Sequence, residues 1–292
     1  MGGVTSSAAY TLDDSTADLA GLVELVGRGE VAVLSGAGLS TESGIPDYRG
    51  PTGLARRADP MTYQRFVGGE EARRRYWARS HVGWSQMRRA QPNAGHRAVA
   101  ELERRGLLAG IVTQNVDGLH QAAGARQVIE LHGGLDRVVC LSCRERTPRA
   151  ELDRRLREAN PGWRATSDAI NPDGDAVLTD EQVAGFQVVG CATCGGVLKP
   201  DVVFFGENVP KPRVDECFDI VGRARGLLVL GSSLAVRSGL RFVIRAAELG
   251  IPVAIVNQGT TRGDAHAELT LDAPLGPTLS RLAARLAAEQ GE

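Results

Sequence analysis

Four of the five cysteines fall into two C-x-x-C pairs, and this pattern constrains the fold more than any other feature of the chain. Cys140 and Cys143 form "CLSC", and Cys191 and Cys194 form "CATC". Each pair supplies two thiolates from one tight turn, and four thiolates complete the tetrahedral shell of a structural zinc ion. We therefore expect a closed zinc site with no position for a reactive water. Redox-active or idle thiols are the alternatives.

Short apolar runs alternate with amphipathic helical patterns outside the cysteine segment. The runs are "VAVLS", "AGIVTQN", "QVIEL", "GLLVLG", "PVAIVN" and "ELTL". Patterns such as "PNAGHRAVAELERRG" and "SGLRFVIRAAELG" lie between several of them. This alternation predicts an α/β fold, with a Rossmann-like parallel sheet that helices cover on both faces.

Two stretches interrupt the alternation and suggest how the chain is divided. We expect the Rossmann-like domain to comprise residues 19–135 and 206–292, with a helical insertion at about 50–92. Residues 136–205 are expected to form a smaller, inserted zinc-binding module, and residues 1–18 an N-terminal extension.

The balance of charges argues against two classes of partner. The 292 residues include 34 Lys and Arg against 35 Asp and Glu, a formal net charge of −1. Nothing therefore draws the whole chain toward nucleic acid or an anionic membrane. The N-terminal stretch has neither the basic region nor the apolar run of a signal peptide, so we expect a cytoplasmic protein.

The stretch "VAVLSGAGLSTESGIPDYRG", residues 31–50, runs from a buried strand into a glycine turn. Backbone N–H groups at Gly36, Ala37 and Gly38 can approach a pyrophosphate there, although a plain structural turn is the alternative. The third glycine of the dehydrogenase fingerprint is missing. Three further polar loops, "TQNVDGLH", "GSSL" and "VNQG", follow strand candidates. Because ligands of such sheets bind beyond the carboxyl ends of the strands, the four loops predict a pocket for a ribose-rich ligand.

Taken together, these motifs resemble the sirtuins, a family of NAD-dependent protein deacylases. The matching stretches are "GAGLSTESGIPDYRG", "TQNVDGLH", "ELHGGLDRVVCLSC", "CATCGGVLKPDVVFFGE", "GSSL" and "VNQG", and they look most like the class II branch. The resemblance implies NAD as co-substrate, zinc as a structural ion and an acylated lysine of a protein as substrate. Nicotinamide would leave, and the acyl group would pass to ADP-ribose.

Two other functions stay open at this point. A mono-ADP-ribosyltransferase would use the same NAD pocket, and the class II branch is linked to that activity as well. A non-catalytic NAD sensor or zinc-ribbon binding module would need no catalytic residue, and the presence of His132 and Asn115 argues against it.

The resemblance assigns the catalytic step to His132 and Asn115. His132 in "ELHGG" would act as general base on a ribose hydroxyl, since an imidazole titrates near neutral pH. Asn115 would contact the nicotinamide-side ribose. By itself, His132 is as readily a buried structural histidine.

The resemblance also implies a set of NAD contacts. "SGIPDYRG" would be a mobile loop that closes over NAD and shields the sugar from water. The residues that would bind NAD are Gly36, Ala37, Gly38, Ser40, Ile45, Asp47, Tyr48, Arg49, Gln114, Asn115, Asp117, Gly231, Ser232, Ser233, Asn257, Gln258 and Ala273.

The substrate would meet "KPDVVFFGE", an edge segment that pairs with the peptide backbone as an added strand. Its contacts would come from Val202, Val203, Phe204, Phe205, Gly206 and Glu207, whereas an ordinary core strand is the alternative. Tyr76 and Arg79 are residue types that another sirtuin branch uses to bind succinyl-like carboxylates. An arginine-rich solvated face is the interpretation that we favour for this stretch.

Overall fold

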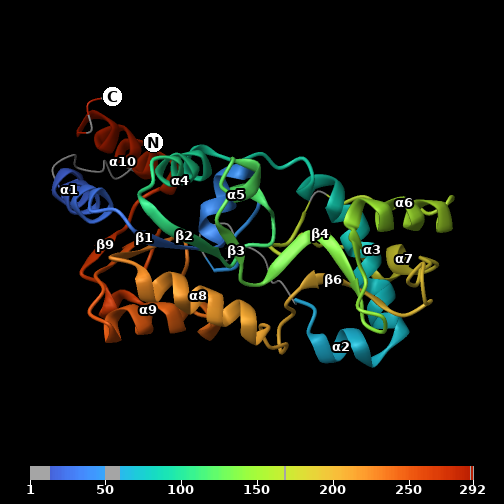
Figure 1. Ribbon diagram of the computed structural model, residues 1–292. Helices are drawn as coiled ribbons and strands as arrows, with labels where there is room; N and C mark the ends of the chain where they lie inside the picture. The colour runs from blue at the N-terminus through green and yellow to red at the C-terminus, as the bar shows by residue number, and fades with distance from the viewer. Residues whose placement is uncertain (1–13, 50–59, 168, 290, 292) are drawn as a thin grey trace, which may run out of the picture.

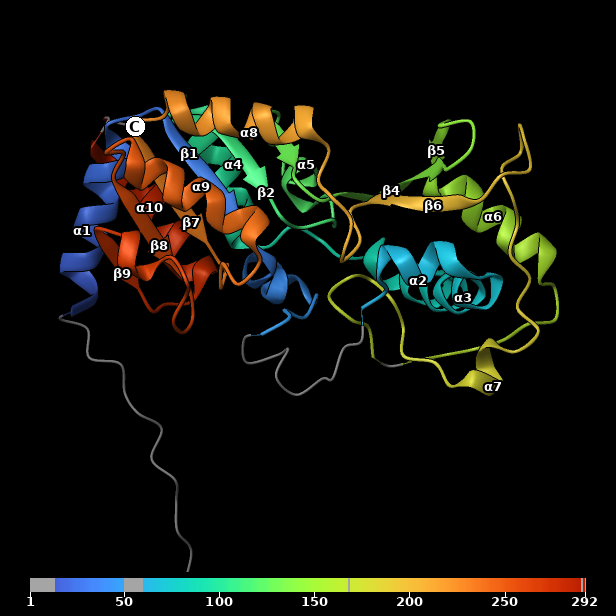
Figure 2. The ribbon, with the colours of Figure 1, turned by 90° about the horizontal axis from the view of Figure 1, so that it is seen from below.

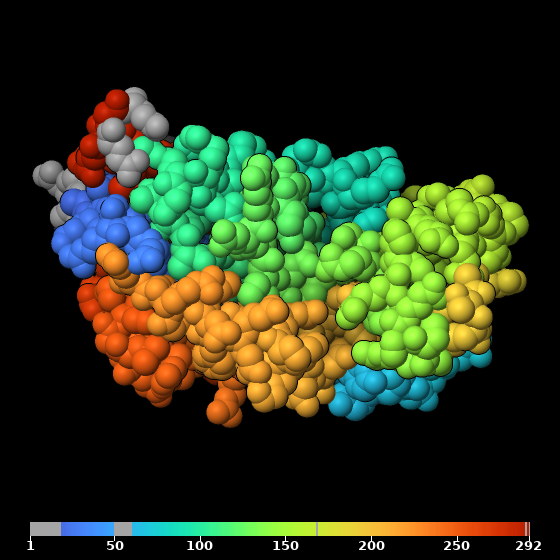
Figure 3. Space-filling view, viewed as in Figure 1, coloured from blue at the N-terminus to red at the C-terminus, as the bar shows by residue number. Residues whose placement is uncertain are grey.

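The structure is a computed structural model that describes residues 14–49, 60–167, 169–289 and 291. Most of the expected N-terminal extension, and the first part of the expected helical insertion, lie outside these ranges. The rest of the chain forms an elongated molecule with a larger and a smaller lobe (Figure 3).

The larger lobe contains a six-stranded sheet in which every pairing is parallel. Each predicted apolar run forms one of its strands, so the α/β prediction is confirmed. In spatial order the strands are β3 (Val128–Glu130), β2 (Leu108–Thr113), β1 (Val31–Ser35), β7 (Gly226–Leu230), β8 (Val253–Val256) and β9 (Leu269–Leu271).

Alternate residues of the central strands enter two separate cores. Val31 and Val33 of β1 face a core that includes α1 (Asp14–Gly27), α4 (Ala94–Arg104) and α10 (Leu275–Glu289). Ala32 and Leu34 face the core under α8 (Lys211–Arg223) and α9 (Arg237–Glu248). Both faces of the sheet are covered, as Figures 1 and 2 show, which explains why the strands are apolar without a polar alternation.

The smaller lobe is built around a three-stranded antiparallel sheet of β5 (Arg146–Pro148), β4 (Gly133–Cys140) and β6 (Leu198–Val202). Two of its helices, α6 (Arg149–Ala159) and α7 (Asp180–Val183), come from the segment between the cysteine pairs. The others, α2 (Tyr63–Gly68) and α3 (Glu70–Met87), come from the arginine-rich insertion. Phe66 and Trp77 share one buried core with Leu156 and Phe186, so the two interruptions of the sequence pack on each other.

The order of the strands creates one reversal in the large sheet. From β1 the chain moves outward through β2 and β3, and it later returns to β7 on the other side of β1. A crevice forms where the connections leave neighbouring strands in opposite directions, beyond the carboxyl ends of β1 and β7.

The four paired cysteines meet in the smaller lobe. Their sulfur atoms all lie within 4.8 Å of one another. The Cys140 and Cys194 sulfurs are 3.5 Å apart, and those of Cys143 and Cys191 are 3.7 Å apart. A tetrahedral ion with bonds of about 2.3 Å to sulfur needs sulfur-sulfur distances of roughly 3.8 Å, so the cluster fits zinc. Cys217 lies apart from it, buried under the large sheet.

Two buried histidines connect elements of the larger lobe through hydrogen bonds and the packing of their rings. His96 completes the capping box of α4, where its Nδ1 accepts a hydrogen bond from the Asn93 N–H. His120 lies against it, with ring centroids 5.2 Å apart, and bonds Ser35. Burial lowers the pKa of His96 to about 3 and that of His120 to about 4. Both rings are therefore neutral in the folded protein near pH 7.

Within the described ranges, no helix combines the length and the apolar character that crossing a bilayer requires.

Replacing Cys143 by Ala should remove the zinc and destabilise the smaller lobe. Cys143 is exposed, so little packing is lost apart from the metal. We expect bound zinc, measured by mass spectrometry, to fall from one ion per chain to none, and the thermal midpoint to fall by about 10 °C, or roughly 3 to 5 kcal/mol. Cys217→Ala should keep its zinc. A zinc-loaded Cys143→Ala protein would contradict the assignment.

Replacing His96 by Gln should make the protein less sensitive to acid. Between pH 7.5 and pH 5 the unfolded chain protonates this histidine and the folded chain does not, so stability falls as the pH falls. Gln keeps the capping box without a titratable ring. We expect the loss of unfolding free energy over this range, from urea titrations, to shrink by about 2 kcal/mol. His266→Gln, on an exposed histidine, is the control. An unchanged pH dependence in His96→Gln would rule out a neutral His96.

Candidate active site

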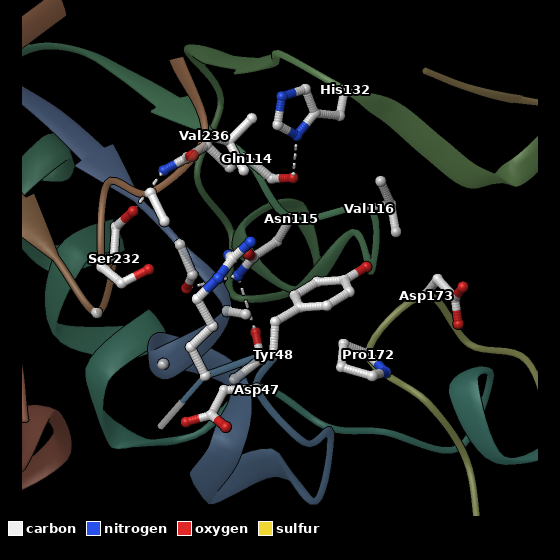
Figure 4. Close-up of a pocket in the computed structure, with 18 of the residues that line it drawn as sticks. Asp47, Tyr48, Gln114, Asn115, Val116, His132, Pro172, Asp173, Ser232 and Val236 are labelled. Atoms are coloured by element: carbon white, nitrogen blue, oxygen red, sulfur yellow. Dashed lines mark hydrogen bonds between the residues drawn. The ribbon is translucent and has the colours of Figure 1, made fainter. Parts of the chain in front are cut away.

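A cavity of about 1340 Å³ lies between the two lobes. The larger lobe contributes the loops that follow β1, β2, β7 and β8, as the four polar motifs predict. The smaller lobe contributes Met61, Tyr76, Leu135, Pro172 and the chain from Val202 onward. Side chains from both lobes point into this space in Figure 4.

The glycines after β1 serve close packing between two loops. A Cβ at Gly38 would lie 2.9 Å from the Cα of Gly231, and a Cβ at Gly36 would lie 2.8 Å from the Gly231 carbonyl oxygen. The Gly36 N–H donates to the Leu230 carbonyl at 2.9 Å, and the Gly38 N–H donates to the Gly231 carbonyl at 2.8 Å. These two amides are thus engaged inside the protein. The contact of Gly36, Ala37 and Gly38 with a pyrophosphate stays a prediction.

A polar network fixes the floor of the cavity. The Asn115 side-chain amide donates to the Gly36 carbonyl at 3.0 Å and to Ser40 Oγ at 3.1 Å. Ser40 in turn donates to the Asp117 carboxylate at 2.7 Å, and Asp117 also accepts the Leu119 N–H. Burial raises the pKa of Asp117 despite these hydrogen bonds. The network ties the loop after β2 to the turn after β1, which continues as the short helix η1 (Ala37–Ser43).

Gln114 connects three strand ends. Its side-chain amide donates to Ser232 Oγ at 2.8 Å, after β7, and to the Ser35 carbonyl at 3.3 Å, at the end of β1. Its backbone carbonyl lies 3.0 Å from His132 Nδ1. Figure 4 shows the contacts of Gln114 with Ser232 and with His132 as dashed lines.

His132 lines the cavity and is held at both ring nitrogens. A carbonyl oxygen can only accept, so Nδ1 carries the proton that is shared with Gln114. In the neutral ring Nε2 is then the acceptor, and Ser238 Oγ lies 2.9 Å from it. Burial lowers the pKa of His132, and the positive charges of Arg213 and Arg241 lower it further. The imidazole is thus available as a base at neutral pH.

The segment Ile45 to Arg49 forms one wall. Ile45 and Asp47 are buried, and Tyr48 is half-buried with its ring edge toward Phe205, at a centroid distance of 6.2 Å. Burial raises the pKa of Tyr48, and the charges of Asp173 and Asp175 raise it further. Gly50, the last residue of the expected mobile loop, lies outside the described residues.

The opposite wall is the chain that leaves β6, an edge strand of the small sheet. The Val203 N–H donates to the His132 carbonyl at 2.8 Å, while the Phe205 carbonyl accepts from the Tyr63 N–H. Phe204 is buried, whereas Phe205 is 39% exposed. The segment is therefore extended but ends its regular pairing at Val202, earlier than "KPDVVFFGE" suggests.

The Glu207 carboxylate already has interaction partners within this wall. Its carboxylate lies 3.1 Å from the Nζ of the buried Lys199 and accepts the Phe204 N–H at 2.9 Å. The expected contact of Glu207 with the peptide backbone therefore has to come from its main chain, or to replace one of these bonds.

Every catalytic, NAD-binding and substrate-binding residue expected from the sequence lines the cavity except Ala273, whose neighbours Asp272 and Pro274 do. Sequence reasoning missed several lining residues. Pro172 and Asp173 come from the long segment between the cysteine pairs, where no motif marks them. Ser238 and Arg241 lie on α9, and their only signal was their position shortly after "GSSL".

Tyr76 and Arg79 separate in the structure. Tyr76 is buried and lines the cavity, whereas Arg79 does not. The Arg79 Nε donates to the Ala176 carbonyl at 2.9 Å, and its positive charge faces Asp173 and Asp175. Arg79 is thus neither a free carboxylate clamp nor part of a fully solvated face.

Comparison with known proteins adds independent support. The Sir2 family matches residues 36–238. "NAD-dependent protein deacetylase 1" of Streptomyces coelicolor is 62% identical over 281 residues, covering 96% of this chain and 94% of that protein. "NAD-dependent protein deacetylase" of Xanthomonas axonopodis pv. citri is 56% identical over 232 residues, 80% of this chain and 79% of that protein.

Solved structures that are similar to this chain include Sir2 proteins. One described as "Sir2-p53 peptide-NAD+" has a TM-score of 0.72 and 30% identity, and covers 93% of this chain and 98% of that chain. Another, described as "Sir2 bound to acetylated peptide", has a TM-score of 0.71 and 28% identity, and covers 94% and 98%. The placement in the class II branch stays a prediction. The family match over residues 36–238 and the relatives with more than half of their residues identical show that this chain belongs to the Sir2 family.

Proposed function

We propose that this chain is an NAD-dependent protein-lysine deacylase, with the cavity between the lobes as its active site. The observation that carries the proposal is the convergence of three groups on one space. These are the strand-end loops of a Rossmann-like sheet, a half-buried neutral imidazole, and an extended edge segment from the smaller lobe. The names of the relatives, NAD-dependent protein deacetylases, agree with it.

NAD, when bound, supplies the glycosidic bond whose cleavage releases nicotinamide and makes the ribose carbon electrophilic. The loops after β1, β2, β7 and β8 would hold it, since all four line the cavity. Asn115 and Gln114 would orient the ribose, because their side chains are already fixed by hydrogen bonds to neighbouring loops. Tyr48 and Phe205 would exclude water from the reacting atoms.

His132 would take a proton at Nε2. Its Nδ1 is committed to the Gln114 carbonyl, so Nε2 is the nitrogen with a lone pair. Removing a proton from a ribose hydroxyl would let that oxygen bond to the acyl carbon as the bond from this carbon to lysine Nε breaks and the amine leaves with a proton. The amide oxygen of the acyl-lysine would replace nicotinamide on the ribose, and water would supply the new carbonyl oxygen of the transferred acyl group.

The acyl-lysine would enter along Val203 to Gly206. The proposal extends to the acyl group, for which we favour uncharged acyl chains over carboxylate-bearing ones. Asp173 lines the cavity on the side of the smaller lobe, and burial raises its pKa. A carboxylate-bearing acyl chain placed there would meet a second carboxyl group in a space where the charged form of a carboxyl group is disfavoured.

We also propose a location in the cytoplasm. Four thiolates within 4.8 Å of one another remain available to a metal ion where the thiols stay reduced.

Replacing His132 by Ala should strongly slow the transfer of the acyl group from lysine to ADP-ribose, the step in which the base takes a proton. Loss of a general base costs about 10²- to 10⁴-fold. The measurement is nicotinamide release with and without acetylated peptide, with mass spectrometry of both products. A fully active His132→Ala protein would exclude the proposed base. ADP-ribose attached to protein, with the acetyl group left on lysine, would instead identify a mono-ADP-ribosyltransferase.

Replacing Arg79 by Met should affect all acyl substrates alike. Arg79 supports the loop that carries Asp173 and does not line the cavity. We expect kcat/KM for acetyl, succinyl and glutaryl peptides to change by the same factor, within about threefold. A selective loss of desuccinylation of tenfold or more would instead favour the carboxylate clamp.

A further inference from the structure

The start of α9 carries one of the two groups that hydrogen-bond the His132 ring, and it packs against Gln114, the residue that carries the other. Ser238 is the second residue of this helix, is 9% exposed, and has its Oγ 2.9 Å from His132 Nε2. None of the sirtuin motifs in the sequence includes it. Among the described side chains, it is the hydrogen-bond partner of His132 on the Nε2 side.

Gly239, the next residue, packs on Gln114. A Cβ there would lie 2.5 Å from Gln114 Oε1 and 2.8 Å from Gln114 Cδ. Gln114 is the residue whose carbonyl fixes His132 Nδ1. Two consecutive residues of α9 thus constrain the imidazole, one directly and one through its other partner.

We propose that Ser238 is a positioning residue that holds the His132 ring with Nε2 directed into the cavity before the substrate hydroxyl arrives. A hydroxyl suits this task because it can donate and accept. It donates to Nε2 of the neutral ring, and it accepts from the Nε2 proton of the charged ring. The inference rests on the proposed function of His132 as general base.

The two states of the ring are not stabilised equally by Ser238. A hydrogen bond from a charged imidazolium is stronger than one to a neutral ring. Ser238 therefore favours the charged form and opposes the effects that lower the pKa of His132. Those effects are burial and the positive charges of Arg213 on α8 and Arg241 on α9. Removal of the hydroxyl should lower the pKa of His132 further.

The first experiment measures the ring itself and needs no catalysis. In protein with ¹⁵N-labelled histidine, the signals of His132 are assigned by their loss in His132→Ala. We expect the parent protein to show the Nδ1–H tautomer, and Ser238→Ala to titrate about half to one pH unit lower. An unmoved titration in Ser238→Ala, or an Nε2–H tautomer in the parent, would overturn the proposal.

The second experiment measures the pH profile of kcat/KM for deacylation, which reports the free enzyme. We expect the midpoint of the acidic limb in Ser238→Ala to shift to a pH that is lower by the same half to one unit. We also expect kcat at pH 8 to fall about fivefold or more. Ser238→Thr, which retains the hydroxyl, should restore the limb. Ser85→Ala, on an exposed serine of α3, should match the parent. An unshifted limb in Ser238→Ala would refute the proposal.

The two experiments separate the inference from the function on which it rests. If His132 titrates as expected while His132→Ala stays active, the contact is real and the proposed base is wrong. If His132→Ala is inactive while Ser238→Ala leaves both the titration and the limb unchanged, the base stands and Ser238 is not its positioning residue.

Discussion

The site depends on how closely the loops after β1 and β7 approach each other. These strands are neighbours in the sheet, but their connections leave in opposite directions. Gly36, Gly38 and Gly231 let the two loops touch at backbone distance, and the N–H groups of Gly36 and Gly38 bond across the gap. Any side chain at Gly38 would push the backbone of the partner loop away. The crevice beyond the strands exists because these two loops are locked together rather than splayed.

Hydrogen bonds from the polar residues of the cavity connect these two loops to β2 and α9. Asn115 binds the β1 loop, and Gln114 binds Ser232 of the β7 loop. The Gln114 carbonyl accepts a hydrogen bond from His132 Nδ1, and Ser238 Oγ contacts Nε2 on the other side of the ring. Each donor of this set has a partner on a different element. Ring position is therefore set by packing of the whole sheet edge, which is how a catalytic group is held in place before substrate binds.

The smaller lobe is joined to the same histidine through its backbone. The His132 carbonyl accepts the Val203 N–H, just where β6 ends and the proposed substrate segment begins. Lys199 and Glu207 hold that segment from within the lobe. The imidazole thus lies at the junction between the part of the chain that would bind NAD and the part that would bind acyl-lysine. A shift of one lobe against the other would move both relative to the base.

Local patterns were sufficient to predict the six strands of the large sheet, several of the helices around them and the cysteine cluster, because burial on both faces makes strands apolar and zinc needs paired thiolates. The four polar loops and His132 could also be named, since each sits in a short motif. The contacts of Pro172, Asp173 and Ser238 could not. Pro172 and Asp173 lie on a segment whose position depends on how the two lobes pack, and Ser238 reaches His132 because of where α9 packs. No spacing in the sequence encodes either arrangement. For the same reason the sequence could not show that the Gly36 and Gly38 amides bond the neighbouring loop, or that Arg79 faces Ala176 instead of the cavity. The sequence by itself determined which groups the chain carries and which elements present them. Only the tertiary structure decided which of them share one space, because that depends on contacts between residues far apart along the chain.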